Sequence, residues 1–180
     1  MSQGVITIGG FPLPSDTPAF LSVLAVHVAA GSWCVVTGLV AMLSPKGPGR
    51  HHRFGSFYFW GLLVVFVTMS ILSAMRWKEN YHLFVLGTLS FGCALTGRRD
   101  APSRSGHLRL HVAAMAMSYI VMLTAFYVDN GKNLPLWRSL PHIAYWFIPS
   151  IVGIPIMLRV LRHHPLVRSE LGRMEARGSV

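Results

Sequence analysis

The chain has little charge, and most of it is of one sign. Only 12% of its 180 residues are Asp, Glu, Lys or Arg, whereas a soluble domain of similar size carries about 25%. Sixteen residues are Lys or Arg, six are Asp or Glu, and 52% of the chain is hydrophobic. Because so few charges cannot solvate a large surface in water, we expect the chain to fold in a lipid bilayer. The basic residues lie in short segments between apolar tracts, which is typical of membrane topology and not of nucleic-acid binding.

Several chemical signatures are also missing. The two cysteines, Cys34 and Cys93, lie inside apolar runs and form no CxxC or CxxCH motif, which argues against a disulfide framework and a c-type haem attachment site. The first 14 residues contain no Lys or Arg and so lack the charged start of a secretory signal, and we expect residues 1–17 to form an exposed tail. No GxSxG, HExxH or phosphate-binding loop motif occurs, so the sequence makes no firm prediction of an enzyme.

Five apolar tracts are each close to the roughly 17–25 residues that a helix needs to cross a bilayer. They cover residues 18–43, 53–75, 81–97, 108–128 and 142–161. The tracts are continuously apolar, which favours helices, and Pro18 after three polar residues is a typical helix start. We therefore predict an all-α integral membrane protein: five transmembrane helices in an antiparallel helix bundle, a four-helix core plus one, as a single domain over residues 18–162. No internal sequence repeat is visible, and Pro149 and Pro155 predict a kink in the last helix.

The basic residues between the tracts predict the orientation. The first and third connections and the C-terminal segment carry three, four and five Lys or Arg, whereas the second and fourth connections carry two each. Because basic loops stay on the cytoplasmic side, we expect the N-terminus outside and the basic tail, residues 163–180, in the cytoplasm of a bacterium, with the helices in its inner membrane. The tail fits either a short interfacial helix or a solvated segment.

Nine histidines are many for a membrane protein of this size, because ionisable groups at membrane depth are costly and usually face the bundle interior. His27 lies nine residues into the first tract, about 13 Å below its start. Gly31, Cys34 and Gly38 share its helical face and predict the close approach of a neighbouring helix. We expect His27 to point inward, either as a ligand or as a neutral histidine bonded to a neighbour.

His107 and His111 are four residues apart, so they lie on one helical face. Two histidines at this spacing can bind a metal ion, but the four arginines nearby would repel a free cation. The same charges suit an anionic partner, such as lipid headgroups or haem propionates. They equally suit a group that only marks the membrane interface. His163 and His164 lie in the basic tail, and we expect them to be surface residues.

One histidine from each of the last four tracts follows a regular spacing. His52, His82, His111 and His142 are 29–31 residues apart, so successive members alternate between membrane faces. Two such pairs, one on each face, are the arrangement that holds two b-type haems across a bilayer. In this layout the chain resembles cytochrome b561-like electron-transfer proteins, in topology and spacing but in no local motif. His82 and His142 lie at helix starts, which is shallow for such ligands.

The local sequence resembles an uncharacterised bacterial family of multi-pass membrane proteins, defined by a domain of unknown function, over roughly residues 19–162. The stretches that carry the resemblance are HVAAGSWCVVTGLVAML, KGPGRHHRFGSFYFW, LFVLGTLSFGCALTG and HVAAMAMSYIVMLTAFYVDN. The recurring elements are matched by His27 with Gly31, by His52, Arg53 and Gly55 before an aromatic run, and by His111 with Tyr119. The resemblance implies a shared site at His27, His52 and His111. It does not include His82 or His142, and it supplies no activity.

We predict a membrane protein whose histidine-lined interior binds b-type haem or a metal ion, for electron transfer or for assembly of a redox complex. The predicted cofactor ligands are His27, His52, His111 and His107, with His82 and His142 as weaker candidates. Gly31, Gly38, Gly92 and Ser118 are predicted to pack helices. The expected partners are the bilayer and either a second copy or a membrane redox complex. A small-solute transporter or channel and a scaffold without chemistry are the alternatives. No carboxylate lies inside an apolar tract, which disfavours a proton-coupled or cation-coupled carrier.

Overall fold

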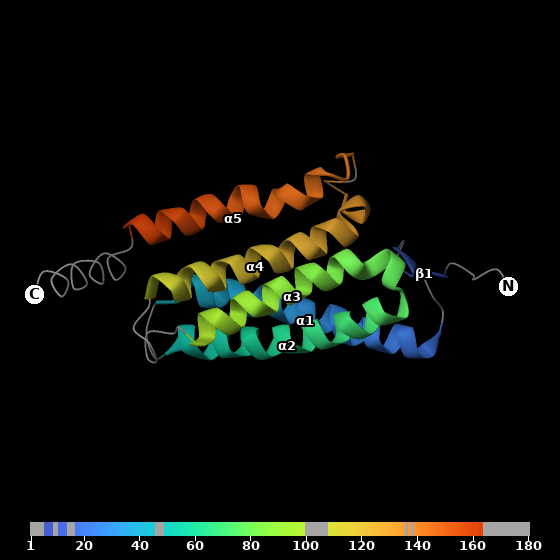
Figure 1. Cartoon of the computed structure of the whole chain (residues 1–180), viewed down its shortest axis with the longest axis horizontal. Helices are drawn as coiled ribbons and strands as arrows, with labels where there is room; N and C mark the ends of the chain where they lie inside the picture. The colour runs from blue at the N-terminus through green and yellow to red at the C-terminus, as the bar shows by residue number, and fades with distance from the viewer. Residues whose placement is uncertain are drawn as a thin grey trace, which may run out of the picture. The chain divides into compact units, whose positions relative to one another are not determined.

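The computed structural model describes residues 6–8, 11–13, 17–45, 49–99, 108–135, 137 and 139–163. Most of this part of the chain is helical (Figure 1). The helices are α1 (Pro18–Leu43), α2 (Arg50–Met75), α3 (Trp77–Arg99), α4 (Leu108–Asn130), the short 3-10 helix η1 (Gly131–Asn133) and α5 (Ala144–His163). Two three-residue strands, β1 (Ile6–Ile8) and β2 (Phe11–Leu13), pair in antiparallel orientation. The prediction of a helical protein with five long helices is therefore confirmed, whereas the strand pair was not predicted.

The helix boundaries differ from the apolar tracts where polar residues extend a helix. α1 begins at Pro18, as predicted, with Pro in the first turn. α2 begins at Arg50 and α3 runs on to Arg99, because charged residues are good helix formers that hydropathy alone overlooks. α5 begins at Ala144 and continues through Pro149 and Pro155.

Four helices are long and apolar enough to cross a membrane: α1, α2, α4 with η1, and α5. Their outward side chains are large and apolar. Among the exposed ones are Val28, Val36, Trp60, Val67, Ile151 and Val152. So much exposed apolar surface is costly in water and is the expected surface in hydrocarbon. α3 does not meet the same test. Lys78 and Glu79 open it, Arg98 and Arg99 close it, and small polar residues interrupt its apolar centre.

The chain divides into two compact units, residues 1–88 and residues 89–180, and each is described by itself. In the first unit α1 and α2 lie along one another (Figure 1). The N-terminal half of α3 contacts α2: the ring centroids of Phe66 and Phe84 are 6.5 Å apart, and the Ser73 hydroxyl donates to the carbonyl of Asn80 at 3.3 Å. This half of α3 is thus held by aromatic packing and a polar contact.

In the second unit the C-terminal half of α3 contacts α4, and α4 packs against α5. Tyr145, with 2% of its surface exposed, lies against Gly131, where a Cβ atom would be 2.6 Å from its ring. Further along, a Cβ atom on Gly153 would be 2.5 Å from Ile120. These glycines let the two helices approach closely, and the order of the contacts makes α4 and α5 antiparallel.

Candidate functional site

A hydrogen bond from a histidine side chain joins the end of α1 to the start of α2. We call this helix pair the first hairpin. Nδ1 of His51 donates to the carbonyl of Ala41 at 2.8 Å. In an α-helix that carbonyl would accept from the residue four positions later, but Pro45 has no N–H. His51 therefore satisfies a carbonyl that the end of α1 leaves without its helical partner. We call such a bond a latch, and the end of the hairpin where it lies the turn end.

A second contact lies deeper in the first hairpin. The thiol of Cys34, which is fully buried, donates to the carbonyl of Tyr58 at 3.7 Å, a long and weak bond. A Cβ atom on Gly61 would lie 2.8 Å from the same sulfur. The glycine thus permits the close approach of α1 and α2 at this level.

The same two contacts recur between residues 89–99 of α3 and α4, which we call the second hairpin. Nδ1 of His111 donates to the carbonyl of Gly97, in the last turn of α3, at 2.6 Å. Deeper in this hairpin, the hydroxyl of the buried Ser90 donates to the carbonyl of Ser118 at 2.9 Å. The second hairpin therefore has its own latch and its own inner contact.

The two hairpins match in register as well as in type of contact. In each of them the latch and the inner contact are seven residues apart on both helices. Aligning the contacts places GSWCVVTGLVA (31–41) on GTLSFGCALTG (87–97), where small residues recur at the same positions. The two helix pairs thus share one contact register, which the sequence analysis did not identify.

The latches fix the protonation of both histidines. A carbonyl can only accept, so Nδ1 of His51 and Nδ1 of His111 each carry a proton. In the neutral ring Nε2 is then the basic nitrogen. Histidines that ligate metals are typically oriented in this way, through Nδ1–H to a carbonyl. Sequence reasoning missed His51 and favoured its neighbour His52, and the shared contact register is the signal that would have found it.

His27 makes a different contact, at membrane depth in the first hairpin. Its Nδ1 lies 3.0 Å from Oγ1 of Thr68, which is 8% exposed. The Thr68 hydroxyl gives its own proton to the carbonyl of Val64 at 2.8 Å or of Val65 at 3.1 Å. With that proton on either carbonyl, the oxygen is available to accept from Nδ1–H of His27, and Nε2 is the basic nitrogen of this tautomer. Thr68 is a second residue that the sequence analysis did not identify.

Extending the shared register along the sequence sets Leu83 against His27 and Val128 against Thr68. Leu83 belongs to the first unit and Val128 to the second, so this correspondence is one of sequence register and not of contact. In that register apolar residues stand where the first hairpin has its polar pair.

The small residues that follow His27 in α1 differ in their surroundings. Gly31, one turn after His27, has no atom within 4 Å of where its Cβ would be. Gly38, two turns further on, is buried. Of the other predicted packing residues, Gly92 also borders open space and Ser118 is buried. The face of α1 that carries His27 is thus open beside the histidine.

The structure does not bring His27 and His52 together. His52 is exposed in the first turn of α2, sixteen residues before Thr68, which is about 24 Å along the helix. His111 belongs to the other unit, and His107 lies outside the described residues. His27 and His52 thus lie apart within the first hairpin, and the site that the family resemblance implied at His27, His52 and His111 stays a prediction.

The two weaker candidates lie at the start of α3 and before α5. His82 is half-buried, with its ring 5.6 Å from that of Tyr81. His142 is exposed in the turn before α5, 5.8 Å from the ring of Tyr145. They belong to different units, so their pairing stays a prediction. Among the residues that the structure describes, no group of three His, Cys, Asp or Glu side chains could hold a metal ion.

Comparisons of the chain with models of protein families, with curated proteins and with solved structures found no match. The resemblances to an uncharacterised membrane family and to cytochrome b561-like proteins therefore stay predictions. The molecule is therefore described by its own geometry: helices long and apolar enough to cross a membrane, two helix pairs with the same contact register, and a polar pair midway along the first hairpin.

Proposed function

We propose that this chain is a five-span protein of a bacterial inner membrane, with its N-terminus outside and its C-terminus in the cytoplasm. Four helices meet the requirement of length and apolar composition by themselves. α3 has 23 residues, about 34 Å of helix, which is enough for a hydrocarbon core of roughly 30 Å. Its register matches that of the spanning helix α1, which supports a transmembrane role for α3. The excess of basic residues in alternate connections supports the orientation.

We further propose that the first hairpin binds a b-type haem through Nε2 of His27, for electron transfer or for assembly of a redox complex. The observation that carries this proposal is the His27–Thr68 pair, a contact between two polar side chains within two long apolar helices. A polar pair at membrane depth is a candidate functional site.

A haem fits the available side chains better than a bare metal ion does. Structural and catalytic metal sites usually need three or four protein ligands, and the described residues supply no such group. A porphyrin provides four ligands itself, so one imidazole is sufficient to attach it. The open space beside Gly31, one turn from His27, gives a planar ligand room next to the histidine.

The residues of the first hairpin would each have a distinct role. Thr68 holds the His27 ring by accepting from Nδ1, and so keeps Nε2 as the ligating nitrogen. Bound haem would supply a one-electron couple between ferric and ferrous iron. The electron partner would be another membrane redox protein or a second copy of this chain. His52, His107 and His111 remain predicted ligands.

The test compares the wild type with a variant in which the polar pair is replaced by apolar residues. In His27→Leu/Thr68→Val both polar partners are replaced by apolar groups of similar size, which is close to neutral for stability. We expect wild-type protein from haem-supplied cells to show a Soret band and about one haem per chain, measured as the pyridine haemochromogen. The double variant should hold at least about tenfold less haem while unfolding at the same denaturant concentration.

His163→Leu is the matched control, because it removes from the other unit an exposed histidine that is no predicted ligand, and it should keep its haem. Two results would contradict the proposal. One is wild-type protein that is colourless after expression with ample haem. The other is a double variant with undiminished haem content.

A second candidate is a membrane scaffold without chemistry, and the latches favour it. His51 and His111 are both used to join two helices of a hairpin, which needs no cofactor. If His27 has the same purely structural role, His27→Ala should lower stability by about 1–3 kcal/mol and no cofactor should be found in the wild type. The haem assay therefore separates the two functions.

A further inference from the structure

Aromatic side chains form a row across the two helices of the first hairpin. The ring centroid of Trp33 in α1 lies 5.9 Å from that of Phe57 in α2, at an interplanar angle of 59°. Phe57 in turn meets Phe54 edge to face, with 5.9 Å between the ring centroids. We call these three residues the aromatic row. Trp33 is 52% and Phe57 is 42% exposed, so the row is open on its outer side.

Gly61 lets the indole of Trp33 lie against α2. A Cβ atom on Gly61 would be 3.0 Å from Cδ1 and 3.8 Å from Nε1 of Trp33. The edge of the indole that carries the N–H group therefore lies over the backbone of α2, where a larger side chain would displace it. The contacts with Gly61 and Phe57 thus set the orientation of this indole.

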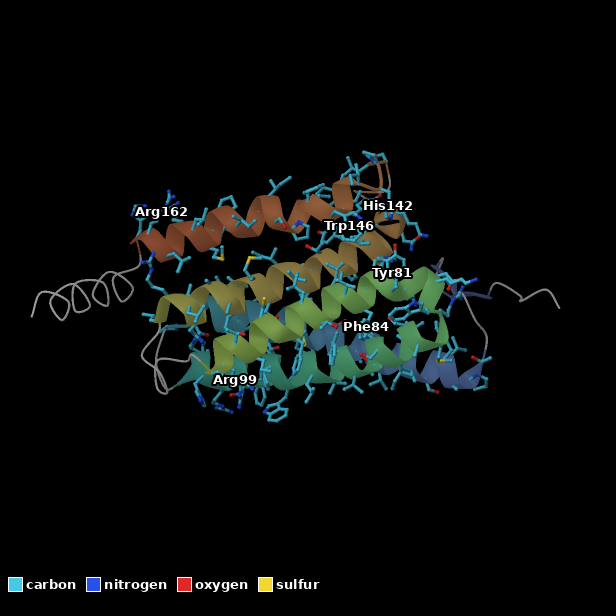
Figure 2. All side chains as sticks on the ribbon, viewed as in Figure 1. Tyr81, Phe84, Arg99, His142, Trp146 and Arg162 are labelled. Carbon is cyan, nitrogen blue, oxygen red and sulfur yellow. The ribbon has the colours of Figure 1, made fainter. Side chains whose placement is uncertain are left out.

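The N–H group of Trp33 lies deep in the proposed membrane span. Trp33 comes fifteen residues after the first residue of α1 and ten before the last, which places it about 4 Å from the midpoint of the helix. Tryptophan in membrane proteins is typical of the interface, where water and headgroups supply acceptors. Along the helices in Figure 2, carbon predominates between the ends and nitrogen atoms gather mostly toward the ends. The indole nitrogen of Trp33 departs from this pattern.

This N–H group donates to no acceptor in the part of the chain that the structure describes. The hydroxyls of Ser22 and Thr37 in the same helix differ, because each donates to a carbonyl one turn earlier, at 2.8 Å and 2.7 Å. A polar hydrogen without an acceptor is costly in hydrocarbon, where no water can take the place of the acceptor. We therefore expect another molecule to supply an acceptor to Trp33.

The second hairpin does not have the aromatic row. In the contact register that the two hairpins share, Leu89 takes the place of Trp33 and Met117 that of Phe57, and both belong to the second unit. The latch and the inner contact are formed there without these aromatic side chains. The row is therefore a feature that these contacts do not require.

The molecules that a membrane offers differ in the acceptor that they bring to this depth. Acyl chains have none, and the ester carbonyls of lipids lie at the border of the hydrocarbon core, roughly 11 Å from the level of Trp33. The backbone carbonyls of a helix from a second copy are bonded within that helix. A quinone with an isoprenoid tail is soluble in the core and carries two carbonyl oxygens on a flat ring.

We propose that the aromatic row binds a membrane quinone. A quinone carbonyl accepts from Nε1–H of Trp33, and the quinone ring packs against Phe57, since flat π-systems favour offset or tilted contact with an aromatic side chain. This inference does not depend on the haem at His27.

The experiment uses the full chain in phosphatidylcholine nanodiscs, with decylbenzoquinone as the probe. An azido derivative of the probe is photolysed, the labelled peptides are identified by mass spectrometry, and competition by unlabelled decylbenzoquinone gives the dissociation constant. We expect saturable labelling of α1 or α2 beside the aromatic row. The His27→Leu/Thr68→Val variant should bind the probe as tightly as the wild type, so the quinone site and the haem site are tested separately.

The variants remove the parts of the site one after the other. Trp33→Phe keeps an aromatic ring but loses the N–H donor, and it should bind the probe about fivefold to tenfold more weakly. Trp33→Leu/Phe57→Met introduces the residues of the second hairpin and should weaken binding by at least about 30-fold. Trp77→Phe is the matched control, because it removes another exposed indole N–H, at the start of α3, and should leave binding unchanged.

Three results would overturn the proposal. One is equal binding by the wild type and Trp33→Phe, and another is equal competition by decylbenzene, which has the ring and the tail but no carbonyl. The third is a dimer, detected by native mass spectrometry, that Trp33→Phe separates, because a second copy would then cover the row. If the double variant fails to fold, Trp33→Phe and the competition with decylbenzene decide the question.

Discussion

The first and second hairpins are closed by the same two bonds but differ in what they carry. Each has a histidine latch on a last-turn carbonyl and a small polar side chain bonded across the helices, in the same register. Only the first has a polar pair at membrane depth, His27 with Thr68. Only the second ends its first helix in two arginines, where the first ends in Met42 and Leu43.

This comparison separates the features that both hairpins have from the features that only one of them has. Features present in both hairpins are explained by folding: the latch satisfies orphan carbonyls, and small residues let the helices approach. Features present in only one hairpin are the better candidates for function. His27 meets this criterion, whereas His51 and His111 are first of all structural.

The largest effect on stability should come from adding a side chain at Gly97, the acceptor residue of the latch in the second hairpin. Gly97 has no room for a side chain, because a Cβ atom would lie 2.8 Å from Cγ and 3.2 Å from the backbone nitrogen of Met115. Gly97→Leu should lower the free energy of unfolding by about 2–3 kcal/mol through overpacking. Unfolding in mixed micelles, followed by far-UV circular dichroism, measures this loss.

The control lies at the turn end of the first hairpin. Gly55, which corresponds to Met115 in the shared register, borders open space. Gly55→Leu should leave stability unchanged or raise it slightly, since leucine is the better helix former. A similar loss in both variants would mean that the two turn ends are equally closed, and the comparison between the hairpins would fail at this level.

An intermediate effect is expected from the latches. His51→Leu and His111→Leu each remove one hydrogen bond to a last-turn carbonyl, at a cost of about 1 kcal/mol in the free energy of unfolding. Because the two latches are equivalent, the two losses should be of similar size. The same micelle unfolding assay gives both values.

His52→Leu is the matched control for the latches. His52 is the neighbour of His51 but is exposed, so its replacement should change stability by less than about 0.5 kcal/mol. A large loss of stability in His52→Leu, or in only one of the two latch variants, would show that the two latches do not have the same structural role.

The fold could be predicted from the sequence to a useful extent, and the site only in part. Long apolar tracts predicted all five helices, because burial in hydrocarbon imposes a length that hydropathy records directly. α3 is the exception in composition, since its charged ends and small polar residues dilute its hydropathy. Such tracts cannot show which face of a helix meets a neighbour.

That limit explains the choice of His52 over His51. The two are adjacent, and the angle of about 100° between successive residues in a helix decides which one reaches α1. The outcome depends on the packing of α1 against α2, which single-residue patterns do not contain. His27 was identified because its depth is a property of sequence position. Its partner Thr68 was not, because it lies 41 residues away in the chain.

The smallest effect should come from the inner contacts. Ser90→Ala removes the hydroxyl that donates to the Ser118 carbonyl at 2.9 Å, which should cost about 0.6 kcal/mol, the typical value of a hydrogen bond between membrane helices. Thr96→Ala is the control, because its exposed hydroxyl bonds only within α3, to Gly92 at 3.0 Å. Cys34→Ser gives the first hairpin the stronger donor of the second and should not lower stability by more than about 0.5 kcal/mol. If Thr96→Ala lowers the free energy of unfolding as much as Ser90→Ala does, the hydrogen bond between α3 and α4 makes no contribution of its own. The equivalence of the two hairpins would then be supported by the latches alone.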